Sequence, residues 1–148
     1  MFLHSLNSFF HIIFNMLCLV FFGPALEAHF GTKRFLILYL GAGIFGGILF
    51  VIASKISSGG MDYLIGASAG VMALVIVYAI LFPHTPVLFF FVFPMEMQTL
   101  AFILVGIDLF WILIGAGNWL GSVAHIGGCI FGVLFYYRRA ILERLSLR

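Results

Sequence analysis

Long apolar runs, separated by short stretches that contain charges, glycine or proline, make up most of the chain. A transmembrane helix needs about 20 apolar residues, with about 17 as a lower limit. We therefore predict five membrane-spanning helices, at about Ser8–Phe22, Phe35–Ala53, Leu64–Phe82, Met97–Gly115 and Ser122–Tyr137. The first and last of these must include flanking residues to cross a bilayer.

A further apolar stretch, Val87–Phe93, is too short to cross a membrane and lies between Pro86 and Pro94. We interpret it as an interfacial or loop segment. The sequence shows no internal repeat of fixed period, no low-complexity stretch and no linker. We therefore expect residues 1–148 to form one membrane domain.

The composition agrees with a membrane protein. The chain has 148 residues, of which 64% are hydrophobic and 8% charged, whereas a soluble domain has about 25% charged residues. These values predict an all-α, polytopic transmembrane bundle with the lipid bilayer as its solvent. The net charge of +2 gives no reason to expect a nucleic-acid partner. We expect no cofactor and no metal, and we interpret Cys18 and Cys129 as packing residues.

The basic residues predict an orientation. One group lies between the first two predicted helices and the other follows the last helix, with a single lysine, Lys55, on the opposite side. The positive-inside rule places both groups, and the C-terminus, in the cytoplasm, and we expect a bacterial inner membrane. The N-terminus would then lie outside, although no signal peptide is visible. The basic residues of the two groups are Lys33, Arg34, Arg138, Arg139, Arg144 and Arg148.

Three groups of polar residues interrupt the predicted helices. His11 and Asn15 lie in the first helix, Ser68 in the third and His125 in the fifth. All three helices enter the membrane from the outside, so these side chains should lie at similar depth. Polar groups are costly to bury in lipid and often mark function there. A serine, a histidine and further hydrogen-bond donors are the groups that acyl transfer requires.

Four sequence elements, in order, resemble the rhomboid family of intramembrane serine proteases over nearly the whole chain. The first three are an H-x3-N pair, a G-x3-E-x3-G element at the end of that helix, and a Gly-x-Ser element that opens the third predicted helix. The fourth is A-H-x2-G-x3-G. Their residues are His11 and Asn15; Gly23, Glu27 and Gly31; Gly66 and Ser68; and Ala124, His125, Gly128 and Gly132.

The resemblance implies a Ser68–His125 dyad that cleaves transmembrane segments of other membrane proteins. It implies that His11, Asn15 and the Ser68 backbone N–H stabilise the oxyanion. It implies a rhomboid-like fold of six helices, so that a first helix would be missing here. The structural motif positions would be Gly66, Gly70, Glu27, Gly128 and Gly132.

Other interpretations remain open from the residues alone. Gly66-x3-Gly70 is also a helix-packing motif, and His11 with Asn15 would also serve as an interhelical polar clamp. For Asp108, inside the fourth predicted helix, we expect a structural hydrogen bond rather than a place in a triad.

Two positions depart from the family pattern. Ala69 stands where members usually have glycine, and Met72 where many have an aromatic residue. A catalytically inactive rhomboid-like protein that binds transmembrane helices is an alternative, which Ala69 and the missing first helix favour. A small transporter or channel is another.

Overall fold

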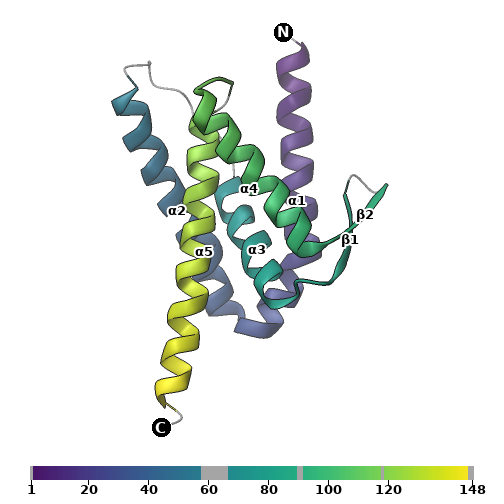
Figure 1. The fold of residues 1–148 in the computed structure, drawn as a ribbon, viewed down its shortest axis with the longest axis vertical. Helices are drawn as coiled ribbons and strands as arrows, with labels where there is room; N and C mark the ends of the chain where they lie inside the picture. The colour runs from purple at the N-terminus through teal and green to yellow at the C-terminus, as the bar shows by residue number, and fades with distance from the viewer. Residues whose placement is uncertain (1, 58–66, 90–91, 118, 147–148) are drawn as a thin grey trace.

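The computed structural model describes residues 2–57, 67–89, 92–117 and 119–146, with side chains described between 11 and 138. Within these residues the chain forms five helices and one two-stranded sheet (Figure 1). The helices are α1 (Phe2–Phe30), α2 (Thr32–Ile56), α3 (Ser68–Leu81), α4 (Met97–Ile114) and α5 (Trp119–Ser146). The strands are β1 (Pro86–Phe89) and β2 (Phe93–Glu96).

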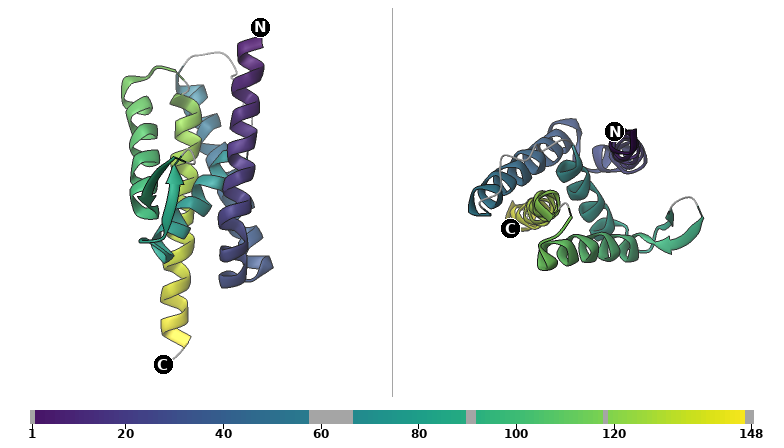
Figure 2. Two further views of the ribbon diagram at one scale, coloured as in Figure 1. Left: turned by 90° about the vertical axis from the view of Figure 1, so that its right-hand side faces the viewer. Right: turned by 90° about the horizontal axis from the view of Figure 1, so that it is seen from above.

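The predicted transmembrane helical bundle is confirmed. In the described part of the chain, α1, α2, α4 and α5 are each long and apolar enough to cross a membrane. The helix α3 has 14 residues, or about 21 Å at 1.5 Å per residue, which is less than the thickness of about 30 Å of a bilayer core. Successive helices run in opposite directions, and the start of α1 and the end of α5 lie at opposite ends of the bundle (Figures 1 and 2).

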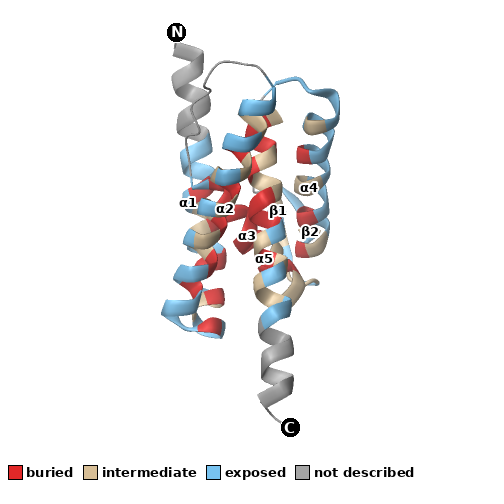
Figure 3. Cartoon of the chain, turned by 90° about the vertical axis from the view of Figure 1, so that its left-hand side faces the viewer, coloured by how far each residue is buried: buried red, intermediate tan, exposed pale blue. Residues whose placement is uncertain are grey.

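The helix α3 lies at the centre of the bundle. Seen from above, the other four helices surround it (Figure 2). Ten of its residues are buried, and it is the most continuously buried helix in the structure (Figure 3). A helix that is hydrophobic on all sides is typical of the core of a larger structure. The residue at its start, Ser68, is therefore held deep among the other helices.

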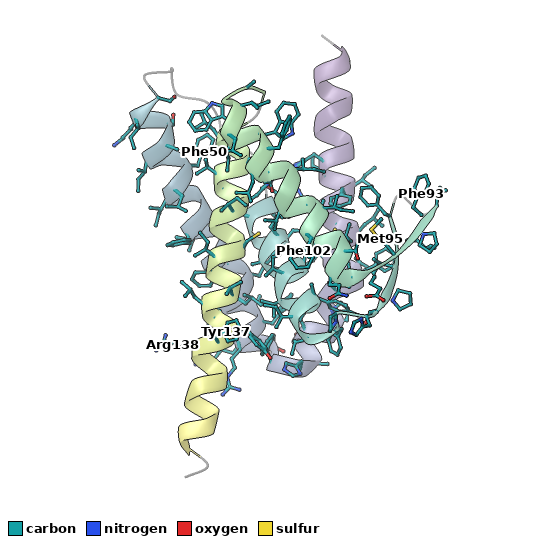
Figure 4. The ribbon with its side chains drawn as sticks, in the orientation of Figure 1. Phe50, Phe93, Met95, Phe102, Tyr137 and Arg138 are labelled. Carbon is teal, nitrogen blue, oxygen red and sulfur yellow. The ribbon has the colours of Figure 1, made fainter. Side chains whose placement is uncertain are left out.

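The outer surface of the bundle is apolar. Large side chains on α2 and α4 are exposed, including Ile44, Phe102 and Leu113, of which Phe102 is labelled in Figure 4. A soluble protein would not expose so much contiguous apolar surface, whereas lipid solvates it well. The protein is therefore an integral membrane protein.

The predicted end of the first helix at about Phe22 is wrong, because α1 continues through Pro24 to Phe30. Proline removes one backbone hydrogen bond, the one that the carbonyl of Val20 would accept. Transmembrane helices tolerate this loss when tertiary packing fixes the helix on both sides. Beyond Pro24, Leu26 and Phe30 are buried in a cluster with side chains of α2 and α3.

The segment between α3 and α4 also differs from expectation in detail. Its described residues Pro86–Phe89 and Phe93–Glu96 pair as antiparallel strands, with Val87 opposite Met95, where the sequence predicts an interfacial or loop segment. The base of the hairpin is tied to α4, because the Met97 N–H donates to the Thr85 carbonyl at 2.9 Å. Alternate residues of β1 are half-buried, a pattern with the period of two that a strand requires.

Candidate active site

Ser68 is the first residue of α3, and Ala67 precedes it as the N-cap. The first backbone N–H groups of a helix have no partner within the helix, and the helix dipole is positive there. The side chain of Ser68 is buried, with 9% of the residue exposed. A developing negative charge beside Ser68 would therefore meet N–H donors that have no partner within α3, in a poorly solvated position.

His125 lies on α5 and faces Ser68. Its Nε2 is 2.9 Å from the Ser68 Oγ, a distance at which the hydroxyl can donate a hydrogen bond to an unprotonated Nε2. Fifty-seven positions separate the two residues in the sequence. The fold thus brings together the two residues that the motifs single out as nucleophile and base.

Asp108 on α4 lies on the other side of the His125 ring. Its two carboxylate oxygens are 3.0 and 3.2 Å from His125 Nδ1, and 7% of the residue is exposed. Asp108 precedes the last residue of α4 by six positions, and His125 follows the first residue of α5 by six. Because the two helices are antiparallel with a short connection, equal spacing from the turn places both at the same height. A structural hydrogen bond was expected for Asp108, without a partner, and this spacing is the sequence signal that identifies His125 as the partner.

Glycines bring α5 against α3 where the site lies. Gly128 and Gly132 face the backbone of Ala69 and Ala73, and a Cβ on Gly128 would overlap the Ala69 carbonyl oxygen. Gly70 is likewise packed against the backbone and ring of Tyr39 on α2. The remaining glycine of the predicted motif, Gly66, lies outside the described residues. These close contacts set the distance between the helices that carry Ser68 and His125.

His11 and Asn15 lie one turn apart on α1 and share one face. The Asn15 amide donates to His11 Nδ1 at 3.4 Å, and Asn15 is buried, with 4% exposed. The His11 ring is close enough to His125 for an electrostatic interaction between them. The polar groups of α1, α3, α4 and α5 therefore gather in one layer of the bundle.

Glu27 lies away from this layer, near the end of α1. Its backbone carbonyl accepts a hydrogen bond of 2.7 Å from the Gly31 N–H. Gly31 has a φ of 81°, which a residue with a side chain rarely adopts, and α2 begins directly after it. The last glycine of the G-x3-E-x3-G element thus forms the turn from α1 to α2, and a Cβ built on Gly23 would lie 3.6 Å from the ring of Phe35.

Ala69 fits its surroundings. Its methyl group lies in a buried cluster with Phe50, Leu120 and Ala124, and it faces Gly46 on α2, where a second methyl group would collide with it. The glycine of α2 leaves the space that the methyl group of Ala69 fills. Met72, the other departure from the family pattern, is buried.

The site's residues lie within a recognised domain. A model of the Rhomboid domain matches residues 1–140. The chain is 30% identical to Rhomboid protein 1, mitochondrial, of Saccharomyces cerevisiae over 97% of its length. It is 29% identical to RHOMBOID-like protein 12, mitochondrial, of Arabidopsis thaliana over 86%. It spans 42% of the length of each of these two relatives.

A bacterial relative is matched over more of its own length. The chain is 29% identical to Rhomboid protease GlpG of Haemophilus influenzae, with 93% of this chain and 66% of the relative covered. No solved structure matches the chain. From the domain match and these relatives, the chain belongs to the rhomboid family.

Proposed function

We propose that this chain is an intramembrane serine endopeptidase in which Ser68 is the nucleophile and His125 the general base. The observation that carries the proposal is the distance of 2.9 Å between Ser68 Oγ and His125 Nε2. Both residues lie inside an apolar bundle. Polar residues are costly to bury there and usually have a function. Relatives that are named proteases, such as GlpG, support the same reaction class.

The reaction follows from this geometry. His125 Nε2 takes the proton of Ser68 as Oγ attacks the carbonyl carbon of a peptide bond. When the tetrahedral intermediate collapses, the C–N bond breaks and His125 returns the proton to the leaving amine. Water, activated by the same nitrogen, then hydrolyses the acyl-enzyme and restores Ser68. The histidine therefore acts first as a base and then as an acid in each half-reaction.

Two sources of hydrogen bonds would stabilise the oxyanion. The first is the start of α3, where the backbone N–H of Ser68 has no partner within the helix. The second is Asn15, with His11 beside it. The bond from Asn15 to His11 is long at 3.4 Å, so the amide would lose little by turning to a charged oxygen, which forms stronger hydrogen bonds than a neutral acceptor.

The substrate class follows from the position of the site. The nucleophile lies within the membrane-embedded bundle, so the substrate would be a transmembrane segment of another membrane protein. An intact helix hides its carbonyl groups in hydrogen bonds, and the segment must therefore unwind locally. We propose cleavage near the outer membrane face, at small residues beside helix-weakening ones.

The orientation of the bundle is part of the proposal. Lys33, Arg34 and Arg138 lie at the end of the bundle where α1 turns into α2 and α5 extends downward (Figures 1 and 4). By the positive-inside rule we propose that this end faces the cytoplasm, and that the membrane is a bacterial inner membrane. The start of α3, with Ser68, then lies nearer the outer face.

A fluorophosphonate probe, which phosphonylates an activated serine, tests the proposal on the detergent-solubilised protein. We expect wild type to be labelled and Ser68→Ala not to be labelled. Ser122→Ala is the matched control, because Ser122 is an equally buried serine on α5 and its loss should leave labelling intact. Folded wild-type protein without label would support the inactive, helix-binding alternative instead.

A further inference from the structure

The carboxylate of Asp108 is in a position that membrane packing alone does not explain. Among the described residues it is the one acidic side chain that is buried. Its two oxygens both lie within 3.2 Å of His125 Nδ1. An unpaired carboxylate inside a bilayer is costly. The other buried residues of α4, Met97, Leu100 and Ala101, lie near the start of that helix. In its second half Asp108 is the one residue that is buried.

The contact fixes which nitrogen of His125 carries the proton. An ionised carboxylate can only accept hydrogen bonds, so the ring must donate from Nδ1. A neutral imidazole has one N–H, and Nε2 is then left with a free lone pair. That lone pair faces the Ser68 Oγ at 2.9 Å. In the other tautomer Nε2 would carry the hydrogen and could not accept the serine proton.

From this geometry, and resting on the proposed function, we infer that Asp108 is a positioning residue for His125. It selects the tautomer with hydrogen on Nδ1, fixes the plane of the ring, and stabilises the imidazolium that forms when Ser68 is deprotonated. The chain would thus use a Ser68–His125–Asp108 triad where the family resemblance implies a dyad.

A structural role for the same contact makes a different prediction. If the bond only fastened α4 to α5, losing it would loosen the helices and lower the melting temperature. A substitution that weakens the packing of α4 elsewhere should then lower the activity as much as loss of Asp108 does. Leu100→Ala provides that comparison, because Leu100 is a buried α4 side chain in the core cluster with Val71 and Val75 and is two turns away from Asp108.

The kinetic test compares wild type, Asp108→Asn and Leu100→Ala on a transmembrane-segment substrate. In triad proteases the corresponding substitution lowers kcat about 10⁴-fold, largely through the wrong tautomer. We expect Asp108→Asn to lower kcat at least about 100-fold, with KM within about threefold and a melting temperature close to that of wild type. Leu100→Ala should lower the melting temperature and keep kcat within about threefold. A kcat for Asp108→Asn within threefold of wild type would overturn the inference, while labelling of Ser68 in wild type would still support the protease.

A second measurement does not depend on activity. In protein labelled with ¹⁵N-histidine, the nitrogen chemical shifts report which ring nitrogen carries hydrogen, and a His125→Ala sample assigns the signal. We expect the tautomer with hydrogen on Nδ1 in wild type and loss of that preference in Asp108→Asn. A wild-type His125 with hydrogen on Nε2 at neutral pH would contradict the inference, whether or not the protein cleaves a substrate.

Discussion

Gly128 lies directly against the backbone of Ala69, the residue that follows the candidate nucleophile, and leaves no room for a methyl group. One turn further along α5, Gly132 packs against Ala73. A Cβ built on Gly132 would lie 3.1 to 3.3 Å from the backbone and Cβ of Ala73. His125 is one turn before Gly128 on the same helix. The distance between Ser68 and His125 is therefore set by glycines that are not part of the chemistry.

Gly128→Ala should abolish most of the activity. The new methyl group would push α5 away from α3, and a displacement of about 1 Å between reacting groups can cost about 100-fold in rate. The rate of Ser68 labelling by a fluorophosphonate measures the effect. Gly43→Ala is the matched control, because a Cβ on Gly43 meets nothing within 4 Å and should leave labelling unchanged. Equal labelling of all three proteins would show that this contact does not set the geometry of the site.

Asn15→Ala should slow catalysis without unfolding the bundle. Loss of one donor to an oxyanion typically lowers kcat by about 10²–10³, and the expected change is in kcat rather than KM because the bond forms in the transition state. Steady-state cleavage of a transmembrane-segment substrate separates the two constants. Met16→Ala, an exposed neighbour on α1, should behave as wild type. A rise in KM alone would assign Asn15 to substrate binding or to the polar clamp with His11.

Much of the fold follows from the sequence because lipid imposes a simple rule on the chain. Long apolar runs become helices: all five predicted helices are present, and four of them are long and apolar enough, within the described residues, to cross a membrane. The helix ends were harder to predict. In water Pro24 would end a helix. Here α1 continues beyond Pro24, because the packing of Leu26 and Phe30 stabilises its last turns. The hairpin β1–β2 depends on pairing between Val87 and Met95, and a short apolar run does not reveal such a pairing.

The site residues that belong to sequence motifs could be predicted. Residues whose role depends on a contact with another helix could not. Ser68 and His125 could be paired in advance because motif and predicted depth agree, and they lie 2.9 Å apart. Asp108 carries no motif, and its role depends on how α4 and α5 face each other. The fit of Ala69 likewise depends on Gly46, which lies on another helix and has no motif that would identify it.

The hairpin base should show a pH-dependent stability. His84 Nδ1 donates to Glu96 Oε2 at 2.9 Å and Gln98 Nε2 donates to the same oxygen at 2.7 Å, and these bonds lower the pKa of Glu96 below its usual value of 4.5. A carboxyl with a lower pKa in the folded state stabilises that state above pH 4.5, and the contribution is lost as the pH falls through the folded-state value. Since the group is exposed, the effect should be small.

Thermal unfolding of wild type and Glu96→Gln in detergent measures this contribution. The variant should melt slightly below wild type at about pH 7, and the difference should shrink and then vanish as the pH falls through the lowered folded-state pKa of Glu96, where the wild-type carboxyl becomes protonated as well. A difference of the same size above and below that pKa would assign it to packing of the hairpin rather than to the charge of Glu96.

Ala69→Gly tests whether the departure from the family's usual glycine weakens the enzyme. The Ala69 methyl group is buried with Phe50 and Ala124 and faces Gly46, so it fills existing space rather than crowding Ser68. Its removal should cost about 0.5–1 kcal/mol of stability, the usual price of glycine in a helix, and should change the labelling rate of Ser68 by less than about threefold. Ala73→Gly, one turn further along α3 and equally buried, is the matched control and should lose similar stability. A labelling rate at least about tenfold higher in Ala69→Gly alone would mean that the methyl group holds the wild-type serine in a poorly reactive position, as the inactive alternative requires.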